Sequence, residues 1–173
     1  MNNLPDSYPY LEPCPGCFED SLRALSERPG SPIFFSNGDF TLERLLTAFS
    51  KLASGGYLLL CTYRLEKKTV EHVRMLMEKG LFDTVLVFCT INASDIDIDM
   101  CGKLRIIQCG MNAFMVQVYN ERRSFTLSGL FMQGVCSYGM EMFVMHNNLD
   151  EQLLIRNTLF SKFRKQLNAY VKR

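Results

Sequence analysis

The stretch that decides the fold runs over residues 55–89 and reads GGYLLLCTYRLEKKTVEHVRMLMEKGLFDTVLVFC. Two apolar runs, Tyr57–Cys61 and Thr84–Cys89, flank a segment whose apolar residues recur at helical spacing. Those spaced residues are Val70, Val73, Leu76 and Met77, and Gly80 stands where a helix commonly ends. Because the two runs are almost continuously apolar instead of alternating, the pattern predicts parallel strands that helices bury on both faces.

The alternation of strands and helices extends outward from this unit in both directions. Upstream, we expect a helix at 42–52, which the turn residues 54–56 end. Downstream, residues 91–103 read as irregular and residues 128–138 read as a loop. Further strands are expected at 33–35, 104–108, 113–119, 123–127 and 140–144.

A final helix closes the predicted order of elements. Asn148, with Glu151 three residues later, resembles a capping box that opens this helix. The apolar residues expected to share its buried stripe are Leu153, Phe160, Phe163, Leu167 and Val171. The whole pattern predicts one α/β domain.

Length and charge also suit one domain behind a short leader. The chain has 173 residues with 19 basic and 18 acidic side chains, a length typical of a single core. All six prolines lie within the first 32 residues, so we expect a Pro/Cys-rich N-terminal leader at 1–31 and one domain at 32–173. The leader carries two basic and five acidic side chains, whereas residues 150–173 carry six basic and two acidic ones.

The net charge of +1 excludes gross electrostatic capture of nucleic acid but leaves room for a local patch. Lys162, Arg164 and Lys165 form the candidate basic patch of the last segment. Such a run is ordinarily a solvated helix face, and cations near a helix C-terminus are favourable in any case.

Three segments of the second half occur in a recognisable order. Residues 112–116 (NAFMV) open a strand, residues 126–130 (TLSGL) follow a turn and a second strand, and residues 138–144 (YGMEMFV) come after a loop. This order resembles one half of the phospholipase D superfamily, in its nuclease-like branch with a single motif per chain. The resemblance covers roughly 32–165 and implies a mixed β-sheet sandwiched between helices.

The catalytic motif of that family is degenerate in this chain. The family attacks a phosphodiester with the His of a His-x-Lys-x4-Asp motif, and its Lys holds the phosphate oxygens. Here the His position is Asn112, the Lys position is Phe114, and the Asp position falls at Tyr119, or at Asn120 with a shift of one residue. An amide cannot serve as that nucleophile, and a phenyl ring cannot balance a phosphate charge.

The family's two later motifs are kept only in part. Ser128 matches the Ser of Gly-Ser-x-Asn, but the Asn position is Leu130, and Glu141 matches the Glu that follows the loop. The resemblance therefore implies the fold without the family's catalysis. We expect a non-catalytic binding or assembly module, without a cofactor, whose cleft is lined by Asn112, Phe114, Ser128 and Glu141.

The same resemblance implies a class of ligand and an oligomeric state. We expect the module to bind nucleic acid or another phosphate-bearing molecule. Family members with one motif per chain dimerise to bring two motifs to one cleft. The resemblance thus implies a homodimer with residues 112–141 at the two-fold axis.

An enzyme remains the alternative, and its chemistry has only two histidines to use. His72 lies on the helix predicted after residue 65, where a solvated position is ordinary. His146 lies at the end of the last predicted strand, a place that carries catalytic groups in α/β proteins. A divergent phosphodiesterase or nuclease using His146 or a metal is therefore the second hypothesis, and a turn histidine without a role is the ordinary interpretation.

The leader carries a Cys-x-x-Cys pair, Cys14 and Cys17, which resembles half of a zinc site. No second pair accompanies it, so surface thiols are the ordinary interpretation and the metal candidate is weak. A third hypothesis is a protein-interaction module that docks its partner through this leader. Asp95, Asp97 and Asp99 begin like a calcium loop, but that loop's required Gly and Glu positions do not follow.

The termini and the remaining cysteines indicate the compartment. The first residues contain neither a basic segment nor an apolar segment of the secretory type. No apolar stretch approaches the ~18 residues that a membrane-spanning helix requires. Most of the seven cysteines lie among apolar neighbours, which is typical of free thiols in a core. We expect a cytoplasmic protein with reduced thiols and no membrane span.

Overall fold

The computed structural model describes residues 18–27, 30–31, 33–36, 41–92, 103–111, 113–129 and 141–165. Its elements in chain order are α1 (Phe18–Ser26), β1 (Ile33–Ser36), α2 (Leu42–Leu52), β2 (Gly56–Leu65), α3 (Lys67–Glu78), β3 (Phe82–Asn92), β4 (Leu104–Gln108), β5 (Phe114–Tyr119), β6 (Ser124–Gly129), β7 (Glu141–His146) and α4 (Leu149–Lys162). From β1 onward the order of strands and helices is the predicted one, with β2 and β3 longer than expected, whereas α1 was not predicted.

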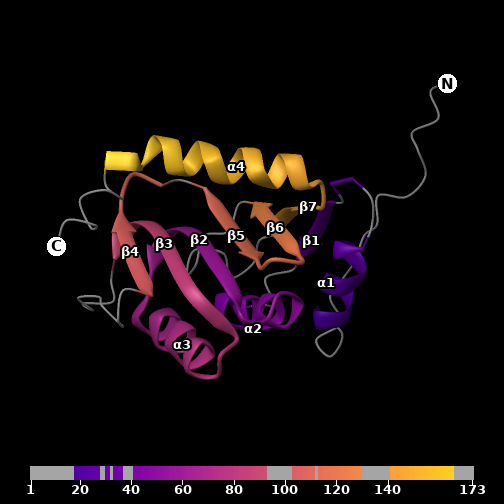
Figure 1. Ribbon diagram of the computed structural model, residues 1–173, viewed down its shortest axis with the longest axis horizontal. Coiled ribbons are helices and arrows are strands. Elements are labelled where there is room, and N and C mark those ends of the chain that lie inside the picture. Colours follow the sequence, from indigo (N-terminus) through magenta and orange to yellow (C-terminus); the bar gives the residue numbers. More distant parts are fainter. Residues whose placement is uncertain are drawn as a thin grey trace.

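The strands of the described residues form one sheet in the order β1-β7-β6-β5-β2-β3-β4 (Figure 1). Strands β2, β3 and β4 run parallel to one another, and the other neighbours are antiparallel. Helix α3 connects the parallel strands β2 and β3, as the sequence of 55–89 predicts. The antiparallel hairpin β5–β6 joins this unit through β5, which pairs with β2.

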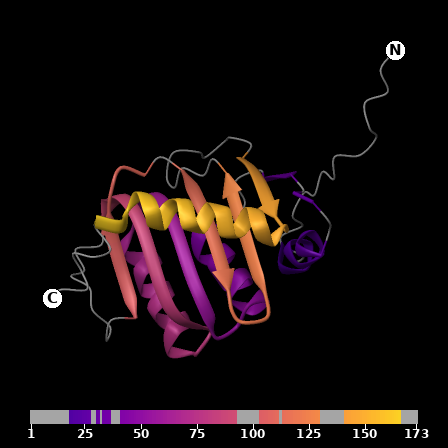
Figure 2. The ribbon, with the colours of Figure 1, turned by 45° about the horizontal axis from the view of Figure 1, so that its top comes forward.

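Helices cover both faces of the sheet. Helices α2 and α3 lie against one face, and α4 crosses the other face over the middle strands (Figures 1 and 2). This arrangement confirms the predicted mixed β-sheet sandwiched between helices. Within the part of the chain that is described, no helix has the length and apolar character needed to cross a membrane.

Local signals account for the ends of the two helices on the first face. The backbone N–H of Arg44 donates to Oγ1 of Thr41, the N-cap residue of α2, at 3.2 Å. Gly80 follows the end of α3 with a φ of 69°, a left-handed conformation that costs glycine little. Both helices therefore begin and end close to where the sequence predicts.

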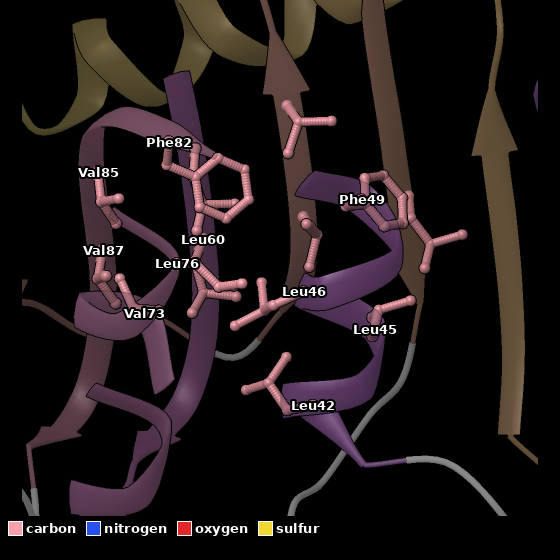
Figure 3. Close-up of a cluster of buried hydrophobic side chains, with 14 of the residues drawn as sticks. Leu42, Leu45, Leu46, Phe49, Leu60, Val73, Leu76, Phe82, Val85 and Val87 are labelled. Atoms are coloured by element: carbon pink, nitrogen blue, oxygen red, sulfur yellow. The ribbon is translucent and has the colours of Figure 1, made fainter. Parts of the chain in front are cut away.

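The main core lies between the sheet and helices α2 and α3. Side chains of both helices point toward the strands, where they meet alternate residues of β2 and β3 (Figure 3). Leu42, Leu45, Leu46 and Phe49 of α2 are all 0% exposed. Full burial of an aliphatic or Phe side chain stabilises a fold by roughly 1.5–3 kcal/mol, so this helix face contributes strongly to holding α2 on the sheet.

Part of the range predicted as an extended leader is helical and packed. Helix α1 falls within residues 1–31, and its Leu22 is 1% exposed and belongs to the main core. Because this side chain buries against the same cluster as α2, the packed part of the chain begins before Pro32. The expected boundary at 31/32 therefore does not separate an extended leader from the domain at α1.

Helix α4 buries part of its predicted stripe together with residues that were not predicted. The side chains that face the sheet are Gln152, Ile155, Leu159 and the C-cap residue Phe163. Phe163 is 5% exposed, and its ring lies 5.1 Å from that of Phe88 between centroids. Phe160 is partly buried against the same cluster as Ile155 and Leu159, Leu153 is partly buried, and the predicted stripe residues Leu167 and Val171 lie outside the described residues. The apolar pattern therefore identified Phe160 and Phe163 correctly but missed Gln152, a polar residue that is buried on the same helix.

Candidate functional site

Strands β6 and β7 bring a serine and a histidine together on the face that α4 covers. Ser128 pairs with Val144 in the ladder, and His146 pairs with Thr126, so the two side chains are diagonal neighbours on one face. Oγ of Ser128 lies 2.7 Å from Nε2 of His146. The sequence placed Ser128 at the start of a loop; because β6 extends to Gly129, it is a strand residue instead.

A carboxylate completes this chain of contacts. Oε2 of Glu151, in the first turn of α4, lies 3.3 Å from Nδ1 of His146. A carboxylate only accepts hydrogen bonds, so a neutral His146 donates Nδ1–H to Glu151 and accepts the Ser128 hydroxyl at Nε2. The resulting order is serine, histidine, carboxylate, which is the order of a base-activated nucleophile. The His146 side chain is 18% exposed and that of Glu151 is 49% exposed.

Glu151 has a second donor that stabilises its charged form. Oγ of Ser31 donates to Oε2 of Glu151 at 2.9 Å. This hydrogen bond, and after it the one from His146, lower the pKa of Glu151 below its ordinary value. The capping box is only half formed, because Asn148 accepts from the N–H groups of Asp150 and Glu151 while the Glu151 side chain turns to Ser31 and His146.

Two buried glutamines hold the backbone of this site against α4. Nε2 of Gln152 donates to the carbonyl oxygen of His146 at 2.7 Å. Nε2 of Gln117 donates to the carbonyl of Gln152 at 3.2 Å and to Oγ1 of Thr126 at 2.8 Å. Gln117 is 0% and Gln152 is 2% exposed, and a buried polar side chain is costly unless it is hydrogen-bonded. The Nε2 groups of both glutamines are thus paired, whereas Oε1 of each is buried without a hydrogen-bond partner among the described residues.

The residues predicted to line one cleft do not share one. Phe114 is 2% exposed in the main core, and its ring meets that of Phe143 edge to face, 6.0 Å between centroids. Ser128 pairs with Met115, the residue next to Phe114, so Ser128 and Phe114 point to opposite faces of the sheet. Glu141 begins β7 and pairs with Ser36, and Asn112 lies outside the described residues.

His72 is part of a polar contact between helices, in contrast to the predicted solvated position. Its Nε2 lies 2.8 Å from Oγ1 of Thr47 on α2. Oγ1 of Thr69 donates to Oε1 of Glu43 at 2.7 Å beside it. Burial lowers the pKa of His72, although the nearby Glu43 carboxylate acts in the opposite direction. His72 therefore helps to dock α3 on α2 and does not reach Ser128 on the far face.

The described residues do not test the metal candidates of the sequence. Cys14 and Cys17 lie outside the described residues, as do Asp95, Asp97 and Asp99. Among the residues that can be described, no group of three or more His, Cys, Asp or Glu side chains is placed to hold a metal ion. Burial raises the pKa of Cys89 to about 11, and the nearby Cys109 adds to this. A thiol with that pKa stays protonated at neutral pH and is a poor nucleophile.

The predicted basic patch is solvated, as its ordinary interpretation requires. Lys162, Arg164 and Lys165 are all exposed at the end of α4. The aromatic side chain between them, Phe163, is buried in the second core cluster. This patch thus supplies positive charge without an exposed ring for a base to stack on.

Two features of the surface were not found from the sequence. Arg23 of α1 and the neighbouring Arg122 and Arg123 line a pocket of about 400 Å³ beside the β5–β6 turn. On the α4 face, Tyr57 and Tyr119 line a second pocket, of about 390 Å³. The sequence signal for the first was the pair Arg122 and Arg123, where a predicted turn meets the strand predicted at 123–127, but Arg23 comes from a range expected to be an extended leader.

Comparison with known proteins supports the fold but does not identify a function. Neither a protein family model nor a curated protein sequence matches the chain. Among solved structures, the chain is similar to polyphosphate kinase from Porphyromonas gingivalis, with a TM-score of 0.54 and 12% sequence identity. The match covers 80% of this chain and 23% of the kinase chain. At this identity the likeness shows the fold alone, a mixed α/β sheet of the phospholipase D type.

Proposed function

We propose that this chain is a phospholipase D-like domain that binds a phosphate-bearing ligand without performing the family's phosphodiester chemistry. The observation that carries the proposal is the position of Phe114. It stands where the resemblance places the phosphate-binding lysine, and its ring is packed in the core against Phe143. No cation therefore balances a phosphate charge at this position.

The arginine pocket supports the binding part of the proposal. Arg23, Arg122 and Arg123 line it together with a single carboxylate, that of Glu27. None of the three arginines forms an ion pair with another described residue. Guanidinium groups bind phosphate oxygens in a bidentate manner, and several around one hollow attract a polyanion. The homodimer that the resemblance implies remains a prediction.

The arginine pair at the β5–β6 turn provides the test of binding. Replacing Arg122 and Arg123 together by Ala should weaken the binding of inorganic tripolyphosphate about tenfold or more, because two charged hydrogen-bond donors are lost. Isothermal titration calorimetry at low salt measures the Kd. The matched control is Arg164→Ala with Lys165→Ala, which removes the same two charges from an exposed helix end and should change the Kd little.

Two outcomes count against the proposal. If neither the wild-type protein nor any variant binds tripolyphosphate or an oligonucleotide, the binding function is wrong. If the purified protein cleaves DNA without a metal and Asn112→Ala or Glu141→Ala abolishes the cleavage, the domain has kept a catalytic motif.

A second function, an enzyme, is favoured by the contacts of His146. The Ser128–His146–Glu151 chain has the contacts by which a histidine accepts a hydroxyl proton while a carboxylate orients its ring. In this function Ser128 attacks the phosphorus of a phosphodiester, the leaving alkoxide departs, and water later releases the phosphoryl group from Ser128. His146 accepts the serine proton and then returns it to the leaving group.

This second function predicts a specific pattern of losses. Hydrolysis of bis(p-nitrophenyl) phosphate should be measurable, and His146→Ala or Ser128→Ala should each lower its rate by about 10²–10⁴-fold. Ser161→Ala, at an exposed position of α4 that lines neither pocket, is the control that leaves the rate unchanged. Under the binding function that we favour, wild-type protein hydrolyses this substrate no faster than buffer.

A further inference from the structure

A pocket on the α4 face of the sheet combines an exposed aromatic stack with arginine side chains. Its floor is formed by the beginnings of β2 and β3 and the end of β5, and Phe160 of α4 forms one side. Helix α4 crosses the strands of this face diagonally (Figure 2). The volume of about 390 Å³ falls within the ~300–1,000 Å³ that is usual for ligand pockets.

The stack consists of Tyr57 and Tyr119, which face each other in the β2–β5 ladder. Their ring centroids are 5.1 Å apart and the planes differ by 15°, so the rings are stacked. Tyr57 remains 45% exposed although it is a large ring at the start of a central strand. Because Tyr57 is this exposed and lines the pocket, the stacked pair offers aromatic surface onto which a further planar ring can stack.

Positive charge lies directly beside this platform. The guanidinium carbon of Arg156, on α4, is 4.5 Å from the centroid of the Tyr119 ring. Arg156 and Phe160 are four residues apart and therefore share one side of the helix. Arg105 of β4 also lines the pocket. Burial raises the pKa of Tyr119, so its phenol is neutral and adds no negative charge that would repel an anion.

From these contacts we infer that the pocket stacks a base of a single-stranded nucleic acid on Tyr57, with Arg156 and Arg105 beside the adjoining phosphates. The inference rests on the proposed function and names its ligand class. A planar ring beside a chain of phosphates matches an aromatic platform flanked by arginines. A duplex fits less well, because its bases are already stacked on one another.

The position of the arginine pocket agrees with such a ligand. Tyr119 is the last residue of β5, and Arg122 and Arg123 lie in the turn that follows it. Both pockets thus lie at the same end of β5. When a single strand stacks one base on Tyr57, its neighbouring phosphates can reach the guanidinium groups of the adjoining turn.

Two tyrosines of equal exposure on one strand allow a matched test. Tyr57 is 45% and Tyr63 is 44% exposed, both on β2, and Tyr63 does not line the pocket. Tyr57→Ala should raise the Kd for a fluorescein-labelled oligo(dU) at least about fivefold, the smallest effect usual for loss of one base stack. Tyr63→Ala should leave the Kd within about twofold of wild type. Tyr57→Phe keeps the ring and should keep the affinity.

Further arms of the fluorescence anisotropy titration separate the parts of the ligand. An abasic oligonucleotide of the same length should bind more weakly than oligo(dU) and should not respond to Tyr57→Ala. Arg156→Ala should weaken oligo(dU) binding and reduce the slope of log K against log salt by about one. Parallel titrations with oligo(U) and oligo(dU) show whether RNA or DNA is preferred, since only the 2′-hydroxyl differs.

The outcomes distinguish the stacking site from the proposed function. If oligo(dU) binds and Tyr57→Ala has no greater effect than Tyr63→Ala, the stacking site is overturned while phosphate binding stands. The stacking site is also overturned if tripolyphosphate binds but oligo(dU) does not. If neither tripolyphosphate nor oligo(dU) binds, both the proposed function and the stacking site are wrong.

Discussion

Phe114→Lys places a lysine where the resemblance to the phospholipase D superfamily expects one, and it should unfold the domain. Phe114 is 2% exposed and packs edge to face on Phe143 in the main core. Removing a buried Phe ring costs about 3–5 kcal/mol by itself, and an ammonium group buried without a partner costs more. The sum is comparable to the total stability of a typical domain, about 5–15 kcal/mol.

Urea unfolding followed by circular dichroism measures this effect. Phe114→Lys should give either no cooperative transition or a midpoint far below that of wild type. The control is Ala113→Lys, which places the same ammonium group on the neighbouring exposed residue and should change the free energy of unfolding by less than about 0.5 kcal/mol. A Phe114→Lys variant with the wild-type midpoint and a gain in phosphate affinity would show that this position is open to the ligand.

Gly56→Ala should produce the other large loss of stability. Gly56 begins β2 at a register irregularity of the β2–β3 ladder. A Cβ added there would meet the carbonyl oxygen of Tyr119 and would lie 2.9 Å from the carbonyl oxygen of Ala53. Both obstacles are backbone atoms, so no side chain can rotate away. We expect a loss of about 1–3 kcal/mol, as for other overpacked sites.

The clash in Gly56→Ala should also displace β2 from β5 and so disturb the tyrosine pocket. Gly56 is adjacent to Tyr57 and in close approach to Tyr119, so relief of the clash separates the stacked rings. Gly110→Ala is the matched control, because a Cβ there meets nothing within 4 Å. Thermal unfolding and oligo(dU) affinity should both fall in Gly56→Ala and stay unchanged in Gly110→Ala. Equal melting temperatures in the two variants would show that β2 and β5 can move apart without cost.

Local patterns predicted the elements well because they depend on neighbours in the chain. The helical spacing of Val70, Val73 and Leu76 and the apolar runs on either side predict β2, α3 and β3, and the structure has all three. The predicted strands at 113–119 and 123–127 require a turn at 120–122, and the structure has it, since Oδ1 of Asn120 accepts from the N–H groups of Arg122 and Arg123 at 2.9 Å.

The candidate site was harder to predict because register decides it. The pairing of Met115 with Ser128 places Ser128 and Phe114 on opposite faces, and a shift of one residue would have reversed this. Contact between Ser128 and His146 depends on the β6–β7 pairing in the same way. His146 was a candidate from the sequence, but its serine and carboxylate partners come from separate elements.

By itself, the sequence determined the order of strands and helices from residue 33 onward and the mixed α/β class, and it places Asn112 and Phe114 where the resemblance expects His and Lys. These properties depend on residue type and on spacings within one element. The tertiary structure alone decided that Ser128, His146 and Glu151 meet, that Arg23 joins Arg122 and Arg123, and that Tyr57 stacks on Tyr119 beneath Arg156. The physical reason is that each of these groups joins residues far apart in the chain, and strand register and helix packing bring them together through many weak contacts that no local spacing encodes.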